Sequence, residues 1–339
     1  MIDPHVFIVI VSYNSRKDLG ECLPSLVGQD YSDFEVIVVD NNSADETVNF
    51  VEKNYPSIKV IRNKENYGPA KGYNIGITAS IGKYVVLLNP DTVVEKAWLP
   101  ELVRAMEADE VIAACQSRVL LYNKPDTINT EGNDVHYLGF TWCRNYGKKN
   151  TDDGGIQATL GLSVCSAIIR CHVLEKVGLF DEDFFMYLDD TDLGLRMQLL
   201  GYKVVCNPKS IVYHKYEFSP GKKKLYYLEK NRLLVILKVY PTRALLKVLP
   251  IFMLMEMGLV AMSIWQGWFK EKIASYFWII RRWKLVKSKR QSVVRRRENL
   301  HRILNSMSPA VTFEEIQNPV LDKFVNPLLS AYYRILVRP

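Results

Sequence analysis

The segment that decides how this chain folds is Lys83-Tyr-Val-Val-Leu-Leu-Asn-Pro-Asp-Thr92. Tyr84–Leu88 is an unbroken apolar run of the length expected for a strand buried on both faces of a parallel sheet. Pro90 lacks a backbone N–H and cannot continue a central hydrogen-bond ladder. The strand therefore ends by presenting Asn89 and Asp91 at its carboxyl edge, where open α/β sheets bind ligands.

Two interpretations of this turn are open. Asp91 or Thr92 could cap a helix that the pattern predicts near residues 96–108. Alternatively, Asp91 could bind a hard cation, because Mg²⁺ is often held by one or two carboxylates together with substrate phosphates. The motif alone favours the cap, whereas the rest of the chain favours the metal site.

Composition limits the protein class. At 339 residues and 48% hydrophobic content, the chain is long enough for a large domain with an appendage or for two domains, and it is too apolar for wholesale disorder. The six cysteines form no CxxC pair, so we expect neither a zinc site nor a disulfide framework, and reduced cytosolic thiols are the simplest interpretation. The first residues carry an acid and a proline where a signal peptide carries positive charge, so we expect a first strand there.

The positive charge is confined to one region. Residues 270–302 hold 12 Lys and Arg and two Glu, a local balance of +10. The remaining 32 basic and 35 acidic residues give −3, so the net charge of +7 belongs to a segment near the C-terminus.

The first hundred residues alternate strand and helix. Strands are predicted at 6–11, 34–39, 58–61 and 84–88, and this alternation indicates a parallel sheet with right-handed crossovers. The polar turns after the first, second and fourth strands should therefore gather at one edge of the sheet. The turn after the second strand contains Asp40 and Asn42, which could cap a helix or accept hydrogen bonds from a base or ribose.

Two helix starts follow these turns. Ser43-Ala-Asp-Glu46 reads as a capping box for a helix through about residue 54. The segment from Asn66 to Asn74 opens another helix, and its glycines could simply start that helix or could let the backbone approach an anionic ligand. The spacing is neither GxGxxG nor the P-loop pattern.

The second hundred residues are less regular. A strand is predicted at 111–121, whereas 123–155 is polar, rich in Gly and Asn and without a clear period, as expected of a long functional or mobile segment. Further strands are predicted at 162–169, 203–206 and 211–213.

Asp189 and Asp190 follow a run of aromatic residues at the start of a predicted helix. Acids in a first helical turn can serve only to stabilise the helix. A carboxylate beside apolar surface, however, has a raised pKa that suits it to proton transfer. His214 ends the last predicted strand, as either a structural residue or a metal ligand.

Five motifs in this order resemble glycosyltransferase family 2, and in particular its rhamnosyltransferase-like branch, over about residues 4–240. They are Ile8–Asn14, Val38–Ser43, Asn66–Asn74, Leu88–Asp91 and Tyr187–Leu193. The resemblance implies an α/β GT-A nucleotide-diphospho-sugar transferase fold, a Rossmann-like and mostly parallel sheet flanked by helices. The catalytic domain would be residues 1–240, with a nucleotide-binding half at about 1–110 and an acceptor half at about 111–240.

The resemblance also implies roles for individual residues. Asn89-Pro90-Asp91 takes the place of the family's Asp-X-Asp, so Asp91, together with His214, would bind Mg²⁺ or Mn²⁺. Asp190 matches the catalytic base, and Asp189 lies beside it. No Gln-X-X-Arg-Trp motif follows, which argues against a processive polysaccharide synthase. The implied nucleotide-binding residues are Ser12, Tyr13, Asn14, Asp40, Asn42, Asn66, Gly68, Lys71, Asn74 and Asn89.

The implied reaction is an inverting, metal-dependent transfer of a sugar from a nucleotide-diphosphate donor, dTDP-rhamnose or a UDP-sugar. The acceptor would be a hydroxyl of a lipid-linked glycan or polysaccharide. The competing interpretation is a catalytically silent sugar-nucleotide-binding or scaffolding protein on the same fold.

The region 241–305 is predicted to associate with the membrane. Ile251–Phe269 is nearly long enough to span a bilayer but contains Glu256 and Gln266, and a second apolar piece and the basic run follow. We expect a peripheral or monotopic protein at the cytoplasmic face of the cell membrane, held on an anionic surface by a re-entrant hairpin or by in-plane helices. A buried helical subdomain, serving as a homo-oligomer interface, is the alternative. Nucleic acid is not an expected partner, and the tail 306–339 has no assigned role.

Overall fold

The computed structural model describes residues 6–151, 154–216, 221–294, 299–313 and 319–336. These residues form two compact units. The first contains the described residues up to 133 together with 143–197 and 202–216. The second contains 134–142, 198–201 and the described residues from 221 onward.

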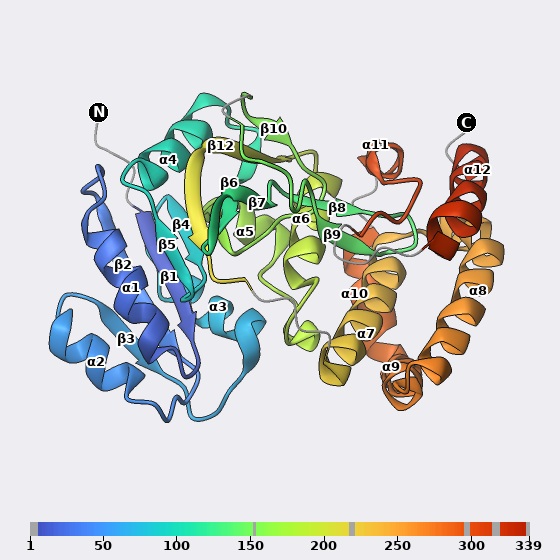
Figure 1. The fold of residues 1–339 in the computed structure, drawn as a ribbon, viewed down its shortest axis with the longest axis horizontal. Coiled ribbons are helices and arrows are strands. Elements are labelled where there is room, and N and C mark those ends of the chain that lie inside the picture. The colour runs from blue at the N-terminus through green and yellow to red at the C-terminus, as the bar shows by residue number, and fades with distance from the viewer. Residues whose placement is uncertain (1–5, 152–153, 217–220, 295–298, 314–318, 337–339) are drawn as a thin grey trace. The chain divides into compact units, whose positions relative to one another are not determined.

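The first unit is built on a mixed, mostly parallel sheet (Figure 1) with the strand order β10-β12-β6-β11-β4-β1-β2-β3. Strands β1, β2, β3 and β4 are parallel, which confirms the predicted α/β class, and β11 runs antiparallel between β4 and β6. The bounds are β1 Val6–Ser12, β2 Phe34–Asp40, β3 Lys59–Arg62, β4 Tyr84–Leu88, β6 Ile112–Leu121, β10 Gln157–Ala158, β11 Ser166–Arg170 and β12 Lys203–His214.

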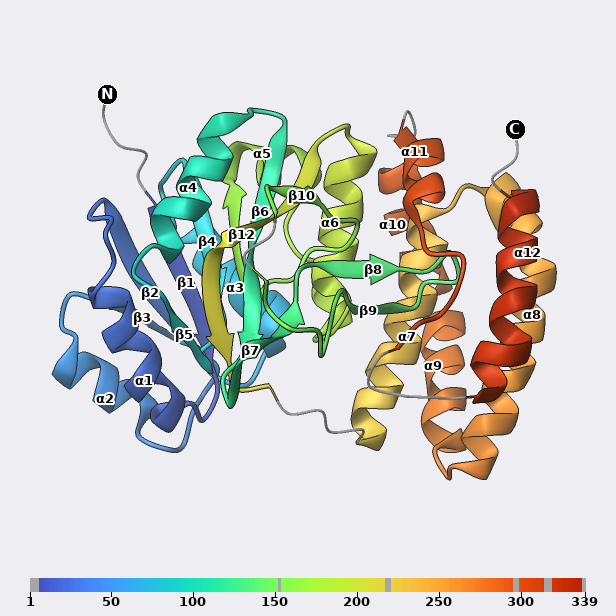
Figure 2. The same ribbon diagram turned by 45° about the horizontal axis from the view of Figure 1, so that its top comes forward.

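Helices cover both faces of this sheet (Figure 2). Leu19 and Leu23 of α1 share a core with Ile8 of β1, a core that also holds side chains of α2 and α4. On the opposite face α3 comes so close that a Cβ added at Gly76 would lie 2.2 Å from Val9 Cγ1, so this helix can pack here only with glycine at that position. The helices are α1 Arg16–Val27, α2 Thr47–Asn54, α3 Gly68–Thr78, α4 Trp98–Ala108, α5 Cys171–Val177 and α6 Asp189–Leu199.

The structure corrects two predicted helix caps. Thr92 does not cap a helix, because it begins strand β5 (Thr92–Val94), which pairs with β12, and α4 begins only at Trp98. The capping box is also wrong, because the residue before α2 is Glu46 in a left-handed conformation without a side-chain cap bond. The hydroxyl of Ser43 is bonded to Asp40 instead.

The segment 123–155 is more regular than its composition indicates. It contains β7 (Lys124–Thr130), which pairs with β6, and the hairpin strands β8 (Asn133–Val135) and β9 (Thr141–Cys143). A buried ion pair between Arg118 and Glu131 helps to order it, and such polar contacts leave no hydrophobic period in the sequence. The two strands predicted at 203–206 and 211–213 are one strand, β12, with an irregularity between Asn207 and Ile211.

The second unit is mostly helical. Helix α7, which the sequence analysis placed in the catalytic domain, packs here against α9 and α10. Among the described residues, α8 alone, with 24 residues, is long and apolar enough to cross a membrane. The helices are α7 Lys222–Val239, α8 Thr242–Trp265, α9 Phe269–Arg281, α10 Trp283–Val294, α11 Leu300–Ser306 and α12 Asn326–Leu336, and Leu321–Val325 is a short π-helical segment.

Candidate active site

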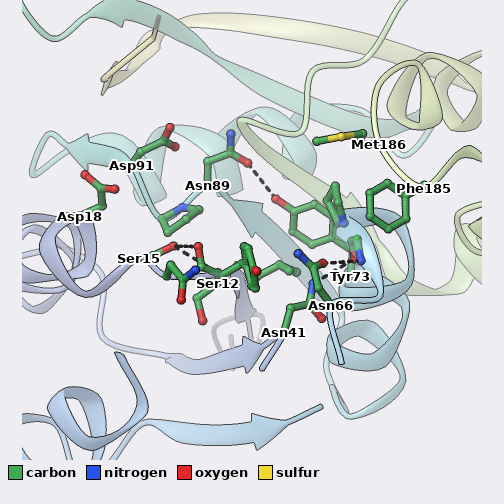
Figure 3. Close-up of a pocket in the computed structure, with 16 residues that line it drawn as sticks. Ser12, Ser15, Asp18, Asn41, Asn66, Tyr73, Asn89, Asp91, Phe185 and Met186 are labelled. Atoms are coloured by element: carbon green, nitrogen blue, oxygen red, sulfur yellow. Dashed lines mark hydrogen bonds between the residues drawn. The ribbon is translucent and has the colours of Figure 1, made fainter. Parts of the chain in front are cut away.

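The turns that follow β1, β2 and β4 meet at one edge of the sheet, as the sequence predicts, and line a cavity of about 340 Å³ in the first unit. The parallel register aligns the ends of β1 and β2, Ser12 with Asp40, and β4 ends at the same edge, with Leu88 opposite Ile10. Figure 3 shows Asp18 and Asp91 on one side of this cavity and Tyr73, Phe185 and Met186 on the other. The volume lies in the range of small-ligand sites.

Hydrogen bonds join the first two turns to each other. The Ser12 hydroxyl donates to Asp40 Oδ1 at 3.0 Å, and the Ser43 amide donates to Asp40 Oδ2 at 2.9 Å. Asn14 has a left-handed backbone, and its Oδ1 accepts from the Ala44 amide at 2.8 Å. Both turns are therefore held in fixed positions before any ligand binds.

Asp40 and Asn42 lie beside the main cavity, in a smaller depression of about 260 Å³ that also includes Arg62 and Asn63. Asp40 is buried, whereas Asn42 is exposed with a left-handed backbone. The neighbouring Asn41 lines the main cavity and accepts from Asn63 at 2.8 Å.

The start of α3 contributes residues of different kinds. Asn66 and Gly68 line the cavity, and the Asn66 side chain accepts from the Gly68 amide at 2.9 Å. Lys71 lies outside the cavity lining, with its ammonium 4.0 Å from the centre of the Tyr67 ring. Asn74 is buried and also lies outside the lining.

The Asn74 side chain bonds to the segment that precedes the paired aspartates. Its Nδ2 donates to the Phe180 carbonyl at 2.9 Å and to Glu182 Oε1 at 3.2 Å, and its Oδ1 accepts from the Phe180 amide at 2.9 Å. One α3 side chain thus holds the acidic loop by three hydrogen bonds.

The predicted metal ligands lie side by side. Pairing of β5 with β12 aligns Thr92 with His214, and His214 Nε2 lies 3.4 Å from Asp91 Oδ2. Among the described residues, Asp91 Oδ1 is buried without a hydrogen-bond partner. His214 Nδ1 lies 2.9 Å from Asn129 Oδ1, an arrangement that orients the ring and leaves Nε2 directed at the carboxylate.

This donor set fits a cation that completes its coordination with ligand oxygens. The described part of the chain contains no group of three or more His, Cys, Asp or Glu side chains that could hold a metal. One carboxylate and one imidazole leave most positions open, as in sites where substrate phosphates complete a divalent cation's shell. Asn89 Oδ1 accepts from the Tyr73 hydroxyl at 3.0 Å, which fixes the amide next to these ligands.

The paired aspartates begin α6. Burial raises the pKa of Asp189 well above its usual range, and the charge of Asp190 raises it further. Burial raises the pKa of Asp190 to about 6, although its carboxylate accepts from the Thr191 and Val164 amides, at 2.7 Å and 3.4 Å. A carboxylate with a pKa near 6 is poised to accept a proton at neutral pH.

The backbone just before these aspartates is strained. Phe185, Tyr187 and Leu188 all have φ between 58° and 66°, a region that non-glycine residues seldom occupy. Such strain persists only where the surroundings fix it, and it concentrates at functional sites. Gly68 belongs to these surroundings, because a Cβ added there would lie 2.7 Å from the Phe185 carbonyl oxygen.

The cavity also contains residues that the sequence patterns do not single out. Asp18 has a recognisable signal, because it is an acid in the first turn of α1, the helix that follows the Ser12–Asn14 turn. Phe185 and Met186 belong to the run of largely aromatic residues that precedes the paired aspartates. Tyr73 carried no signal, because an aromatic residue in a helix normally indicates core. The missed lining residues are Val11, Ser15, Asp18, Asn41, Pro69, Tyr73, Pro90, Phe185 and Met186.

Comparison with known proteins shows the family and supports the fold. The family model described as glycosyl transferase family 2 matches residues 7–178, slightly more than half of the chain. The O-antigen biosynthesis protein RfbC of Myxococcus xanthus is 33% identical over 233 residues, which cover 61% of this chain and 17% of that protein. The chain spans at most about half the length of the curated relatives it matches.

Solved structures show the same architecture. The structure of GalNAc-T7 with UDP, GalNAc and Mn²⁺ gives a TM-score of 0.59 at 15% identity, over 74% of this chain and 51% of that one. Residues 1–349 of TarS from S. aureus give 0.53 at 17% identity, over 98% and 90%. These likenesses confirm the predicted GT-A fold, and with the family match they show that the chain belongs to glycosyltransferase family 2.

Proposed function

We propose that this protein is an inverting, metal-dependent glycosyltransferase that moves a sugar from a nucleotide-diphosphate donor to an acceptor hydroxyl. The observation that carries the proposal is the pair formed by Asp91 and His214, 3.4 Å apart, of which Asp91 lines the cavity formed by the turns after β1, β2 and β4. A carboxylate oxygen without a partner in such a place favours a bound cation. The structural neighbour GalNAc-T7 was crystallised with UDP and Mn²⁺, which supports the same pairing of ligands here.

Binding of the donor would use the turns that are already fixed. The Ser12–Asn14 turn and Asn66, Gly68 and Asn89 would contact the nucleoside diphosphate, with Asp40 and Asn42 close to the base or ribose. Bound Mg²⁺ or Mn²⁺ would neutralise the charge that develops on the leaving diphosphate. Asp91 and His214 would hold that cation, and the bond between His214 and Asn129 would keep the imidazole oriented.

The chemical step would be a single displacement. The acceptor oxygen forms a bond to the anomeric carbon as the bond from that carbon to the nucleoside diphosphate breaks, and the configuration inverts. Asp190 takes the hydroxyl proton, for which its pKa of about 6 is suited. Burial and the neighbouring charge of Asp190 raise the pKa of Asp189 well above the usual range, so the two carboxyl groups have different proton affinities.

The donor would be dTDP-rhamnose or a UDP-sugar, and the acceptor a lipid-linked glycan or polysaccharide. The name of RfbC, an O-antigen biosynthesis protein, supports an acceptor of this kind. Such an acceptor would place the reaction at the cytoplasmic face of the cell membrane, because nucleotide sugars are cytosolic.

The test is a donor panel measured by thermal shift, with and without Mn²⁺ or Mg²⁺, followed by slow donor hydrolysis. We expect one nucleotide sugar to raise the melting temperature only when the metal is present, and to be hydrolysed under the same conditions. If no nucleotide sugar bound with either metal, the proposal would fail. Binding without hydrolysis, even with a glycan acceptor, would favour the sugar-nucleotide-binding scaffold.

A further inference from the structure

A buried charge cluster in the second unit accounts for the acid in α8, the most apolar of the described helices. Glu256 of α8 is bonded to Arg232 of α7 and, at 2.8 Å, to Lys272 of α9. Glu229 of α7 completes the cluster, 2.8 Å from Arg232. All four side chains are buried, so two acids and two bases compensate each other between three helices.

The opposite face of α8 is entirely apolar. Over residues 249–265, nearly five turns, every exposed side chain of this helix is apolar and recurs at helical spacing. Met257 is 67% exposed and Trp265 is 85% exposed. The exposed residues are Leu249, Pro250, Met253, Leu254, Met257, Gly258, Ala261, Ile264 and Trp265. A continuous face of this length marks an interaction surface.

The charge around this face has a single sign. Between residues 242 and 293 the only acids are Glu256, which is buried, and Glu271, which is partly buried. At the junction of α9 and α10, Phe277, Ile280 and Trp283 are exposed among basic residues. The exposed cations of the same stretch are Arg243, Lys247, Lys270, Arg281, Arg282, Lys284 and Lys287.

We propose that α8 lies in the plane of an anionic lipid bilayer, with its exposed face from Leu249 to Trp265 in the outer acyl region and the neighbouring cations at the headgroups. This inference rests on the proposed site of action and extends it, because it names the residues and the orientation. Amphipathic helices with basic flanks and aromatic residues bind membranes in this way.

The charge cluster decides between lying in the plane and crossing. A helix that crossed the bilayer would carry Glu256 near its middle, where an ionised side chain is costly unless it is paired. Arg232 and Lys272 hold Glu256 on the side of α8 that packs against α7 and α9. The helix can keep these ion pairs and turn its uncharged, exposed side to the lipid only if it lies at the membrane–water interface. A second copy of the chain would bring like charges together, since the flanks carry only exposed cations.

The first test compares the binding of matched variants to vesicles, using the full chain. Met257→Glu places an acid on the outer face, whereas Ile81→Glu makes the same change at a side chain of the first unit that is 88% exposed. With vesicles of phosphatidylglycerol and phosphatidylcholine, we expect Met257→Glu to weaken binding about tenfold and Ile81→Glu to leave it unchanged. Equal binding by Met257→Glu and the parent would overturn the proposal.

The second test is topological. Arg243→Cys places a cysteine in the first turn of α8, and Lys270→Cys places one in the first turn of α9, just beyond the other end of α8. The six native cysteines, which are buried or half-buried, give the background labelling of the parent. An impermeant maleimide added outside sealed vesicles should label both variants. Protection of one end only would show that the helix crosses, contrary to the proposal.

Sedimentation without lipid tests whether a second copy of the chain, and not a membrane, covers the exposed face of α8. A parent dimer that Met257→Glu converts to a monomer would show that a second copy covers this face, and would also overturn the proposal. Donor binding, measured on the same variants, is expected to be unchanged. If the parent bound no donor, the proposed function would be refuted, whereas the vesicle measurements would still decide whether α8 binds lipid.

Discussion

Asp91 Oδ2 and His214 Nε2 lie 3.4 Å apart because strand β5 runs antiparallel to β12 and aligns Thr92 with His214. Strand β12, which ends at His214, therefore also fixes the distance between the imidazole and the Asp91 carboxylate. Since Asn129 orients the other ring nitrogen, this pair is organised before any ligand arrives.

Asp91→Ala should remove the metal-dependent part of nucleotide binding, because the cation loses the carboxylate that is proposed to hold it. We expect affinity for the nucleoside diphosphate in Mn²⁺ to fall about 10- to 100-fold, to the value that the parent shows in EDTA. Isothermal titration of both proteins with and without metal measures this. Asn129→Ala, which removes only the side chain that orients the His214 ring, should lower the affinity less. If Asp91→Ala had the same nucleotide affinity in Mn²⁺ as the parent, the metal site would be refuted.

Asp190→Asn should abolish turnover while nucleotide affinity stays within about twofold. Loss of a general base typically lowers the rate 10²- to 10⁴-fold. Transfer assays with the donor identified by thermal shift provide the measurement, and Asp189→Asn is the matched control. If Asp189→Asn lost turnover and Asp190→Asn kept it, the roles of the two carboxylates would be reversed.

The raised pKa of Asp190 should also make folding stability depend on pH. A carboxyl group whose folded pKa lies above its unfolded value stabilises the fold fully below about pH 4, and this contribution is lost as pH rises through about 6. Asp190→Asn cannot ionise, so its free energy of unfolding should gain on the parent as pH rises from 4 to 7, by up to about 3 kcal/mol. Urea unfolding at several pH values tests this, and a constant difference would contradict it.

Asn74→Ala should loosen the acidic loop without emptying the nucleotide site. It removes three hydrogen bonds to Phe180 and Glu182, which should lower the free energy of unfolding by about 2 kcal/mol. We expect turnover to fall while nucleotide affinity is kept, because Asn74 is outside the cavity lining. Ser80→Ala, which alters a single hydrogen bond within the same part of the chain, is the control and should change neither.

Glu256→Ala should destabilise the second unit strongly, because it leaves Arg232 and Lys272 with Glu229 as their remaining acid partner in the cluster. Breaking a buried ion pair by removing one member typically costs about 3 to 5 kcal/mol. Glu271→Ala, at a partly exposed acid of α9, should cost less than about 0.5 kcal/mol. Thermal unfolding of both variants measures the difference, and similar melting temperatures would contradict the importance of the cluster.

The sequence predicts those parts of the structure that local patterns carry. The apolar runs of β1, β2 and β4 and the polar turns after them indicate both the parallel sheet and the edge where the cavity lies, and the carboxylates stand out by their place at element ends. What the sequence cannot show depends on distant partners. Ser43 bonds Asp40 and so forms no capping box, β5 exists only through its pairing with β12, and Asn74 reads as part of a glycine-rich helix start until Phe180 and Glu182 are seen beside it.

The second unit is not contiguous in sequence. It includes residues 134–142, which comprise most of β8 and β9 and the turn that joins them. In that turn Tyr137 is buried, and its hydroxyl donates to the Leu329 carbonyl at 3.0 Å. A protein cut after residue 240 would keep this segment and its hydrogen bonds to Arg232 and Tyr240, but it would lose the contacts of Tyr137 with Leu329 and Tyr333 and so expose an aromatic side chain. The C-terminal helices therefore cannot be removed without exposing residues of this segment. A soluble truncated enzyme would also need polar substitutions in residues 134–142.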